Sequence, residues 1–174
     1  MDKLYIVNYC HPNCVPLYSI TRLPESEAYA MAKDLSTENK GTAFGRFADF
    51  KNYYPKRIRT ERWLHDWFIA TGGEPTVEHP LYFVLHGSDY LDEWFDKGKI
   101  THLSLDSISS KHVSFTFGDS MAQMDKTERK DPFTKEILYG LIQSYNGTMA
   151  ELFSEIGSQY RYIEVQLWND HYCT

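Results

Sequence analysis

The stretch Tyr160-Arg161-Tyr162-Ile163-Glu164-Val165-Gln166-Leu167-Trp168 decides the fold class more clearly than any other part of the chain. Successive side chains of a β-strand point to opposite faces of a sheet. One face of this segment is therefore apolar: Ile163, Val165 and Leu167. The other face carries a carboxylate and an amide between two aromatic rings: Tyr162, Glu164, Gln166 and Trp168. The alternation predicts a strand with one face against a core.

Other segments of the chain predict further strands and helices. Four other segments are typical of strands, being rich in β-branched and aromatic residues: residues 4–9, 81–85, 100–105 and 113–117. Five segments favour helices: one opening at Pro24, one capped by Thr60, one carrying Leu91 to Phe95, one carrying Ile137 to Ile142, and one capped by Thr148. Residues 42–54 remain ambiguous, and the polar residues 118–131 are expected to form a mobile loop.

The order of these elements predicts the fold class. Strict alternation of strand and helix, as in doubly wound folds, is absent, and no linker divides the chain. We therefore expect a single α+β domain over residues 1–174, with a mixed, mostly antiparallel sheet of about five strands and about five packed helices.

Composition and charge exclude several classes of protein. Hydrophobic residues make up 42% and charged residues 24%, which is unlike a disordered chain. The net charge of −6 argues against a general nucleic-acid coat, which would need an excess of Lys and Arg. No apolar run approaches the ~18 residues of a membrane-spanning helix, and the first residues do not read as a signal peptide. Three cysteines do not suggest a secreted disulfide framework, so we expect a cytoplasmic protein with no membrane partner.

The polar face of the last strand is the first candidate site. Glu164 can act as a base or hydrogen-bond acceptor, with Gln166 beside it, while Tyr162 and Trp168 provide rings for a ligand. The alternative is a half-exposed strand whose polar face meets water, since alternation alone produces this pattern in many sheets.

A cluster of basic and aromatic residues is the second candidate. Five basic residues fall between positions 51 and 62 of this acidic chain, interleaved with tyrosines. The residues expected to bind a ligand are Tyr53, Tyr54, Arg57, Arg59 and Arg62. Guanidinium groups can hold phosphate oxygens while rings stack on bases, and a helix beginning at Thr60 would add an anion-binding N-terminus. The alternative is a solvated surface whose charges are balanced elsewhere.

Histidines and cysteines give weaker signals. His86 ends a buried segment just before Gly87-Ser88-Asp89, a position where strand ends often carry functional groups, and is a third catalytic candidate. If the first and last strands are neighbours, a zinc ion could be held by a set from both chain ends: Cys10, His11, Cys14, His171 and Cys173. The C-x₃-C spacing is looser than the usual zinc knuckle, so unremarkable thiols are favoured and no metal is predicted.

Two resemblances emerge from these segments. The chain resembles a group of uncharacterised bacterial proteins in three stretches, residues 47–55, 79–85 and 162–168, but that group implies no activity. The order of three short motifs is similar to that in ADP-ribosyltransferases: His11, then Ser114-Phe115-Thr116, then Glu164-Val165-Gln166. Gln166 stands where that family has its catalytic glutamate, and an amide cannot supply the negative charge.

Two functional hypotheses remain open at the level of sequence. The first is a non-enzymatic binding or regulatory protein that recognises an anionic small molecule, a nucleic acid or a protein partner. The second is a small enzyme acting on a nucleotide-like substrate, including one of the ADP-ribosyltransferase type. The chain has no P-loop, G-x-G-x-x-G, H-E-x-x-H or G-x-S-x-G motif, which argues against standard kinases, dehydrogenases, zincins and α/β-hydrolases. Neither a cofactor nor an oligomeric state is indicated.

Overall fold

The alternating segment near the end of the chain forms β6 (Ile163–Leu167), which lies inside a sheet in the computed structural model of residues 3–174. The described residues form one six-stranded sheet, in the order β3-β1-β2-β6-β4-β5, and every pairing is antiparallel. The other strands are β1 (Tyr5–Cys10), β2 (Leu81–Leu85), β3 (Lys99–Ser104), β4 (Val113–Phe117) and β5 (Phe133–Thr134). The helices are α1 (Glu25–Glu38), α2 (Phe50–Ala70), α3 (Asp89–Trp94), α4 (Ser120–Gln123), α5 (Lys135–Ser144) and α6 (Met149–Tyr160). The predicted α+β class is confirmed.

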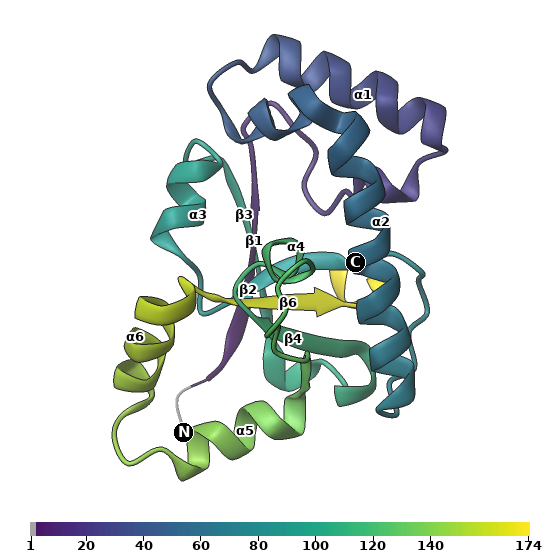
Figure 1. Ribbon diagram of the computed structural model, residues 1–174. Coiled ribbons are helices and arrows are strands. Elements are labelled where there is room, and N and C mark those ends of the chain that lie inside the picture. Colours follow the sequence, from purple (N-terminus) through teal and green to yellow (C-terminus); the bar gives the residue numbers. More distant parts are fainter. Residues whose placement is uncertain (1–2) are drawn as a thin grey trace.

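One face of the sheet carries the main hydrophobic core. The apolar side of β6 meets that of its neighbours through pairs such as Phe83 with Val165 and Leu81 with Leu167. Helices α5 and α6 cover this face, and Figure 1 shows them on the other side of the sheet from α1 and α2. The capping box predicted from Thr148 and Glu151 is present at the start of α6.

The opposite face of β6 is buried as well, beneath α2. Leu64 and Phe68 of α2 pack against Trp168, so every residue of β6 is buried, including the polar ones. The half-exposed strand considered from the sequence is therefore wrong for β6.

None of the helices in the described residues is long and apolar enough to cross a membrane.

A second, aromatic core joins the N-terminal helices. The 3-10 helix η2 (Ala43–Asp49) leads into α2, and its phenylalanines pack with α1 and the first turns of α2. The buried members are Ala28, Ala32, Phe44, Phe47, Phe50 and Tyr54. The three-residue spacing of the phenylalanines, ambiguous in the sequence, is thus the spacing of a 3-10 turn.

Two predicted boundaries are wrong. The helix expected to be capped by Thr60 begins at Phe50 and continues through Pro55, so Thr60 lies buried in the middle of α2, where its hydroxyl donates to the Lys56 carbonyl. The anion-binding N-terminus expected there does not exist. Residues 118–131, expected to be a loop, contain α4, which Asp119 caps by accepting hydrogen bonds from the N–H groups of Met121 and Ala122.

Candidate functional site

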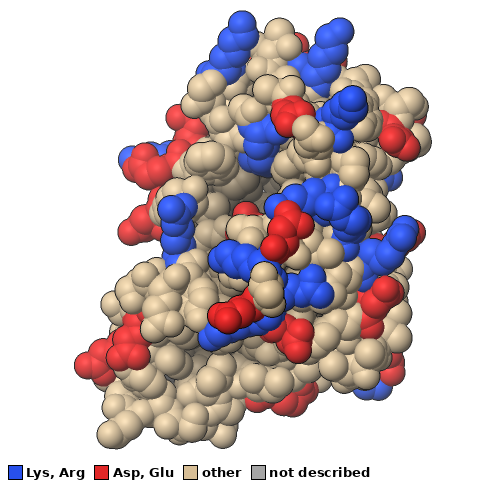
Figure 2. Space-filling view, viewed as in Figure 1, with Lys and Arg blue, Asp and Glu red and all other residues tan. Residues whose placement is uncertain are grey.

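A cavity of about 680 Å³ opens beside the sheet, and residues from many separate parts of the chain line it. Its floor is formed by β1, β2 and β6, and its walls by η2 and α2 on one side and α3 on the other, with residues near α4 at the edge. Figure 2 shows the hollow on the face of the molecule, with basic side chains around its rim. A volume of this size is typical of sites for small molecules and cofactors.

Glu164 is the main acidic group of the floor. Its side chain is buried, at 7% exposure, yet β6 directs it to the cavity. The carboxylate Oε1 accepts hydrogen bonds from the Gln166 amide at 3.0 Å and from the Ser120 backbone N–H at 3.3 Å. Burial, and next the charge of Asp119, raise the pKa of Glu164 from 4.5 to about 7, although Arg57 and these hydrogen bonds oppose the change. The carboxyl group can therefore either donate or accept a proton near neutral pH.

Arg57 lies on the α2 wall of the same cavity, but its charge is already balanced. Its Nε donates to Glu61 Oε1 at 2.7 Å, and its guanidinium lies 3.8 Å above the ring of Tyr82. Glu61 is fully buried and also lies 2.6 Å from His79 Nδ1. This arrangement fixes α2 to the strand beneath it, so Arg57 shapes the cavity wall.

Arg46 is a cavity residue of a different kind. It comes from η2, where its Nη1 donates to the Ala43 carbonyl at 2.6 Å. Its guanidinium lies 4.7 Å from the ring of Phe47 and 5.8 Å from that of Phe95. Within residues 3–174 no carboxylate forms an ion pair with Arg46. The cavity thus holds a cation whose charge the described chain does not neutralise.

Two further polar atoms of cavity residues are buried and unpaired. The Tyr82 hydroxyl and Asn8 Oδ1 have no hydrogen-bond partner within the part of the chain that the structure describes. The Asn8 amide nitrogen donates to the Tyr82 carbonyl at 2.9 Å, which orients the side chain. A buried polar group without a partner costs roughly 1–3 kcal/mol, and the folded protein carries this cost beneath the surface of the cavity.

The polar face of β6 divides between the cavity and the interior. Tyr162 and Glu164 line the cavity, whereas Gln166 and Trp168 do not. Gln166 is fully buried, accepting from Ser114 Oγ at 2.9 Å and donating to Thr116 Oγ1 at 3.1 Å. Trp168 is also fully buried, with its ring stacked on Phe68. Ser114, Thr116 and Gln166, which carried part of the ADP-ribosyltransferase resemblance, therefore form an internal hydrogen-bond network.

The basic cluster divides in the same way. Tyr53 and Arg57 line the cavity, whereas Tyr54 belongs to the aromatic core. Arg59 and Arg62 are exposed on α2 and do not line the cavity. The structure thus brings four of the sequence candidates together at one site: Tyr53, Arg57, Tyr162 and Glu164.

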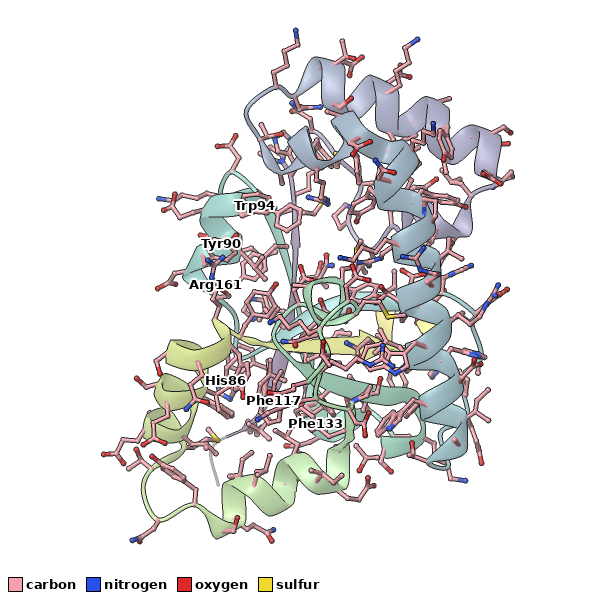
Figure 3. The ribbon with its side chains drawn as sticks, viewed as in Figure 1. His86, Tyr90, Trp94, Phe117, Phe133 and Arg161 are labelled. Carbon is pink, nitrogen blue, oxygen red and sulfur yellow. The ribbon has the colours of Figure 1, made fainter. Side chains whose placement is uncertain are left out.

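His86 lies apart from this site. Its ring is 4.4 Å from that of Tyr5 and 5.0 Å from that of Phe153 of α6, and it does not line the cavity (Figure 3). No cluster of three or more potential metal ligands occurs within residues 3–174. Cys10 and Cys14 do line the cavity as free thiols, and burial raises the pKa of both.

Several cavity residues were not identified from the sequence as parts of one site: Asn8, Arg46, Tyr82, Tyr90, Trp94 and Asp119. Tyr82 stands in an apolar run that predicts only a buried strand, and Arg46 lies in the segment whose structure was ambiguous. The sequence carried no signal that these residues meet.

Comparisons of the chain with protein-family models, with curated proteins and with solved structures give no match.

Proposed function

We propose that this protein binds a small anionic ligand of nucleotide size in the cavity between α2 and α3. The observation that carries the proposal is that Glu164, buried and with a pKa of about 7, lines the same cavity as Arg46, which has no carboxylate partner in the described chain. A perturbed carboxyl group in a cleft is a mark of functional sites. One end of the cavity thus suits an anion, and the floor suits a group that donates hydrogen bonds.

A nucleoside monophosphate has the chemistry that this arrangement requires. Its phosphate suits Arg46, because a guanidinium forms charge-assisted hydrogen bonds with phosphate oxygens. Its ring amino group or ribose hydroxyls can donate to Glu164, which lines the floor of the cavity. The aromatic lining provides apolar contact for the ring. The cavity favours a small molecule over a protein partner, since the polar groups lie inside it.

A thermal-shift screen followed by calorimetry tests the proposal. At about 5 mM, at least one of AMP, GMP, CMP and UMP should raise the melting temperature, because a ligand that binds only the folded state stabilises it. Arg46→Ala should weaken binding of that nucleotide about tenfold or more, the usual scale for losing a charge-assisted hydrogen bond. Arg59→Ala is the matched control, because Arg59 is exposed outside the cavity. Failure of all four nucleotides to bind, or equal effects of the two variants, would overturn the proposal.

The enzymatic alternative rests on the pKa of Glu164. A carboxylate that titrates near pH 7 is suited to remove a proton from a hydroxyl nucleophile. His11 also lines the cavity, so two elements of the ADP-ribosyltransferase motif order share this site. Incubation with NAD⁺ and measurement of released nicotinamide tests the alternative. Wild-type protein should release nicotinamide and Glu164→Gln should not; no release by the wild type would exclude a reaction of the ADP-ribosyltransferase type.

We further propose that the protein is cytoplasmic. Its three cysteines are free thiols in the structure, as expected for a reducing compartment. Fractionation of cells that express the full chain tests this location, and recovery in a membrane or secreted fraction would contradict it.

A further inference from the structure

Helix α3 forms one wall of the cavity without contributing to any core. None of its residues is buried, although Tyr90, Leu91 and Trp94 all line the cavity. Tyr90 is 43% exposed and Trp94 42% exposed, which is unusual for such large rings. Their ring centroids lie 6.0 Å apart at an interplanar angle of 24°, so the two rings form one stacked pair. Figure 3 shows both on α3.

A cation accompanies this aromatic pair. Arg161, which caps the C-terminal end of α6, places its guanidinium 4.6 Å from the centroid of the Tyr90 ring (Figure 3). Arg161 forms no ion pair within residues 3–174. The cation–π contact holds the Tyr90 ring in place and leaves positive charge beside the pair. An aromatic ligand that carries negative charge is therefore complementary to this wall.

The start of α3 is attached firmly to the sheet. The Tyr9 hydroxyl of β1 accepts a hydrogen bond from the Ser88 backbone N–H at 2.8 Å, and the Ser88 side chain caps the helix. Gly87 precedes this contact with φ of +83°, and a Cβ there would lie 2.9 Å from the Tyr9 hydroxyl. Only glycine fits such a close approach without a shift. The aromatic pair is thus presented to the cavity from a fixed position.

We propose that Tyr90 and Trp94 form a ring-stacking subsite that selects ligands with a planar aromatic ring. The inference rests on the proposed function and specifies its ligand class. The ligand is an anionic molecule whose ring packs on the α3 wall while Arg46 holds its acid group. Stacking of a base on an aromatic side chain typically contributes 1–3 kcal/mol, equivalent to roughly 5- to 150-fold in affinity. Tyr90 and Trp94 act as specificity residues.

The test compares AMP with ribose 5-phosphate, which has the sugar and phosphate but no ring. Wild-type protein should bind AMP about tenfold or more tightly than ribose 5-phosphate. Trp94→Ala and Tyr90→Ala should each weaken AMP binding about tenfold and leave ribose 5-phosphate binding unchanged, whereas Trp94→Phe should retain most of the affinity. Ile100→Ala is the matched control, because Ile100 is 47% exposed on β3 and does not line the cavity.

The outcomes separate the subsite from the proposed function. Binding of both probes with equal affinity, unaffected by either alanine variant, would overturn the subsite and leave the cavity as a binding site. Failure of the wild type to bind ribose 5-phosphate and all four nucleotides, AMP, GMP, CMP and UMP, would overturn both. The aromatic-preserving Trp94→Phe variant and the melting temperature of each variant guard against misfolding. A change in tryptophan fluorescence on adding AMP should also be smaller in Trp94→Phe than in the wild type.

Discussion

Replacing Glu164 with glutamine should change the way in which the stability of this protein depends on pH. The carboxyl group is buried in the folded protein, and its pKa is raised from 4.5 to about 7. Between these two values the unfolded chain releases the proton while the folded protein retains it. The stability of the wild type should therefore fall as pH rises from about 4.5 to about 7.

The magnitude follows from the size of the pKa change. The difference between 4.5 and about 7, at 1.36 kcal/mol per pH unit, corresponds to about 3 kcal/mol. Glutamine cannot ionise, and its side-chain oxygen can still accept the hydrogen bonds made by Gln166 and the Ser120 N–H. Glu164→Gln should thus match the wild type near pH 4 and exceed its stability by up to about 3 kcal/mol near pH 8, or roughly 6–12 °C in melting temperature.

Thermal melting from pH 4 to pH 8 measures this effect. Glu61→Gln is the control, because this substitution should lower the stability at high pH where Glu164→Gln should raise it. Burial opposes the charge of Glu61, but Arg57 and His79 outweigh it and lower the pKa of that carboxyl group. Its charge therefore stabilises the fold above its ordinary pKa and ceases to do so as pH falls through the lowered value. Glu61→Gln should be less stable than the wild type at pH 8, by about 3–5 kcal/mol, because it breaks a buried ion pair. If the difference in stability between Glu164→Gln and the wild type is the same at pH 5 and pH 8, a raised pKa of Glu164 is not its cause.

Three other substitutions or treatments test the interior. Trp168→Ala should lower the free energy of unfolding by about 3–5 kcal/mol in denaturant titrations, because removing the buried ring that stacks on Phe68 leaves a void. A loss under about 1 kcal/mol would count against this prediction. Gln166→Leu should cost about 1–3 kcal/mol, since the Ser114 hydroxyl loses its acceptor; an unchanged unfolding midpoint would contradict this. Cys10 should react more slowly with a thiol reagent in the native protein than in the unfolded chain, because burial raises its pKa; equal labelling rates would oppose this.

The last strand illustrates what periodicity alone can predict. The alternation in residues 162–168 correctly predicted a strand with an apolar face, because side-chain direction follows from the backbone. It did not predict that the polar face is buried too. That depends on α2, whose N-cap was predicted eleven residues too late, at Thr60 in place of Asp49. Local propensity does not account for a helix that continues through Pro55, because proline removes a backbone hydrogen-bond donor. Packing of Phe50, Leu64 and Phe68 against the two cores stabilises the helix on both sides of Pro55.

The candidate site shows the same limit at the tertiary level. Glu164, Tyr162, Arg57 and Tyr53 could be selected from the sequence by their chemistry, and the cavity contains all four. Arg46 and Asn8 could not, because their role depends on which elements surround the cavity. Arg46 becomes notable only once the structure shows that no carboxylate pairs with it in residues 3–174. Residue type identifies candidates, whereas the absence of a partner is a property of the folded chain.

The proposed function requires that one ligand contacts the Glu164 carboxyl group inside the cavity. Carboxyl ¹³C NMR of glutamate-labelled protein, titrated with AMP at fixed pH, tests it most directly, with Glu164→Gln used to assign the signal. We expect a saturable shift of the Glu164 resonance, while that of Glu74, which is exposed outside the cavity and paired with Lys111, stays in place. A Glu164 resonance that does not move while AMP binds elsewhere, or that moves only together with Glu74, would show that the ligand does not contact Glu164.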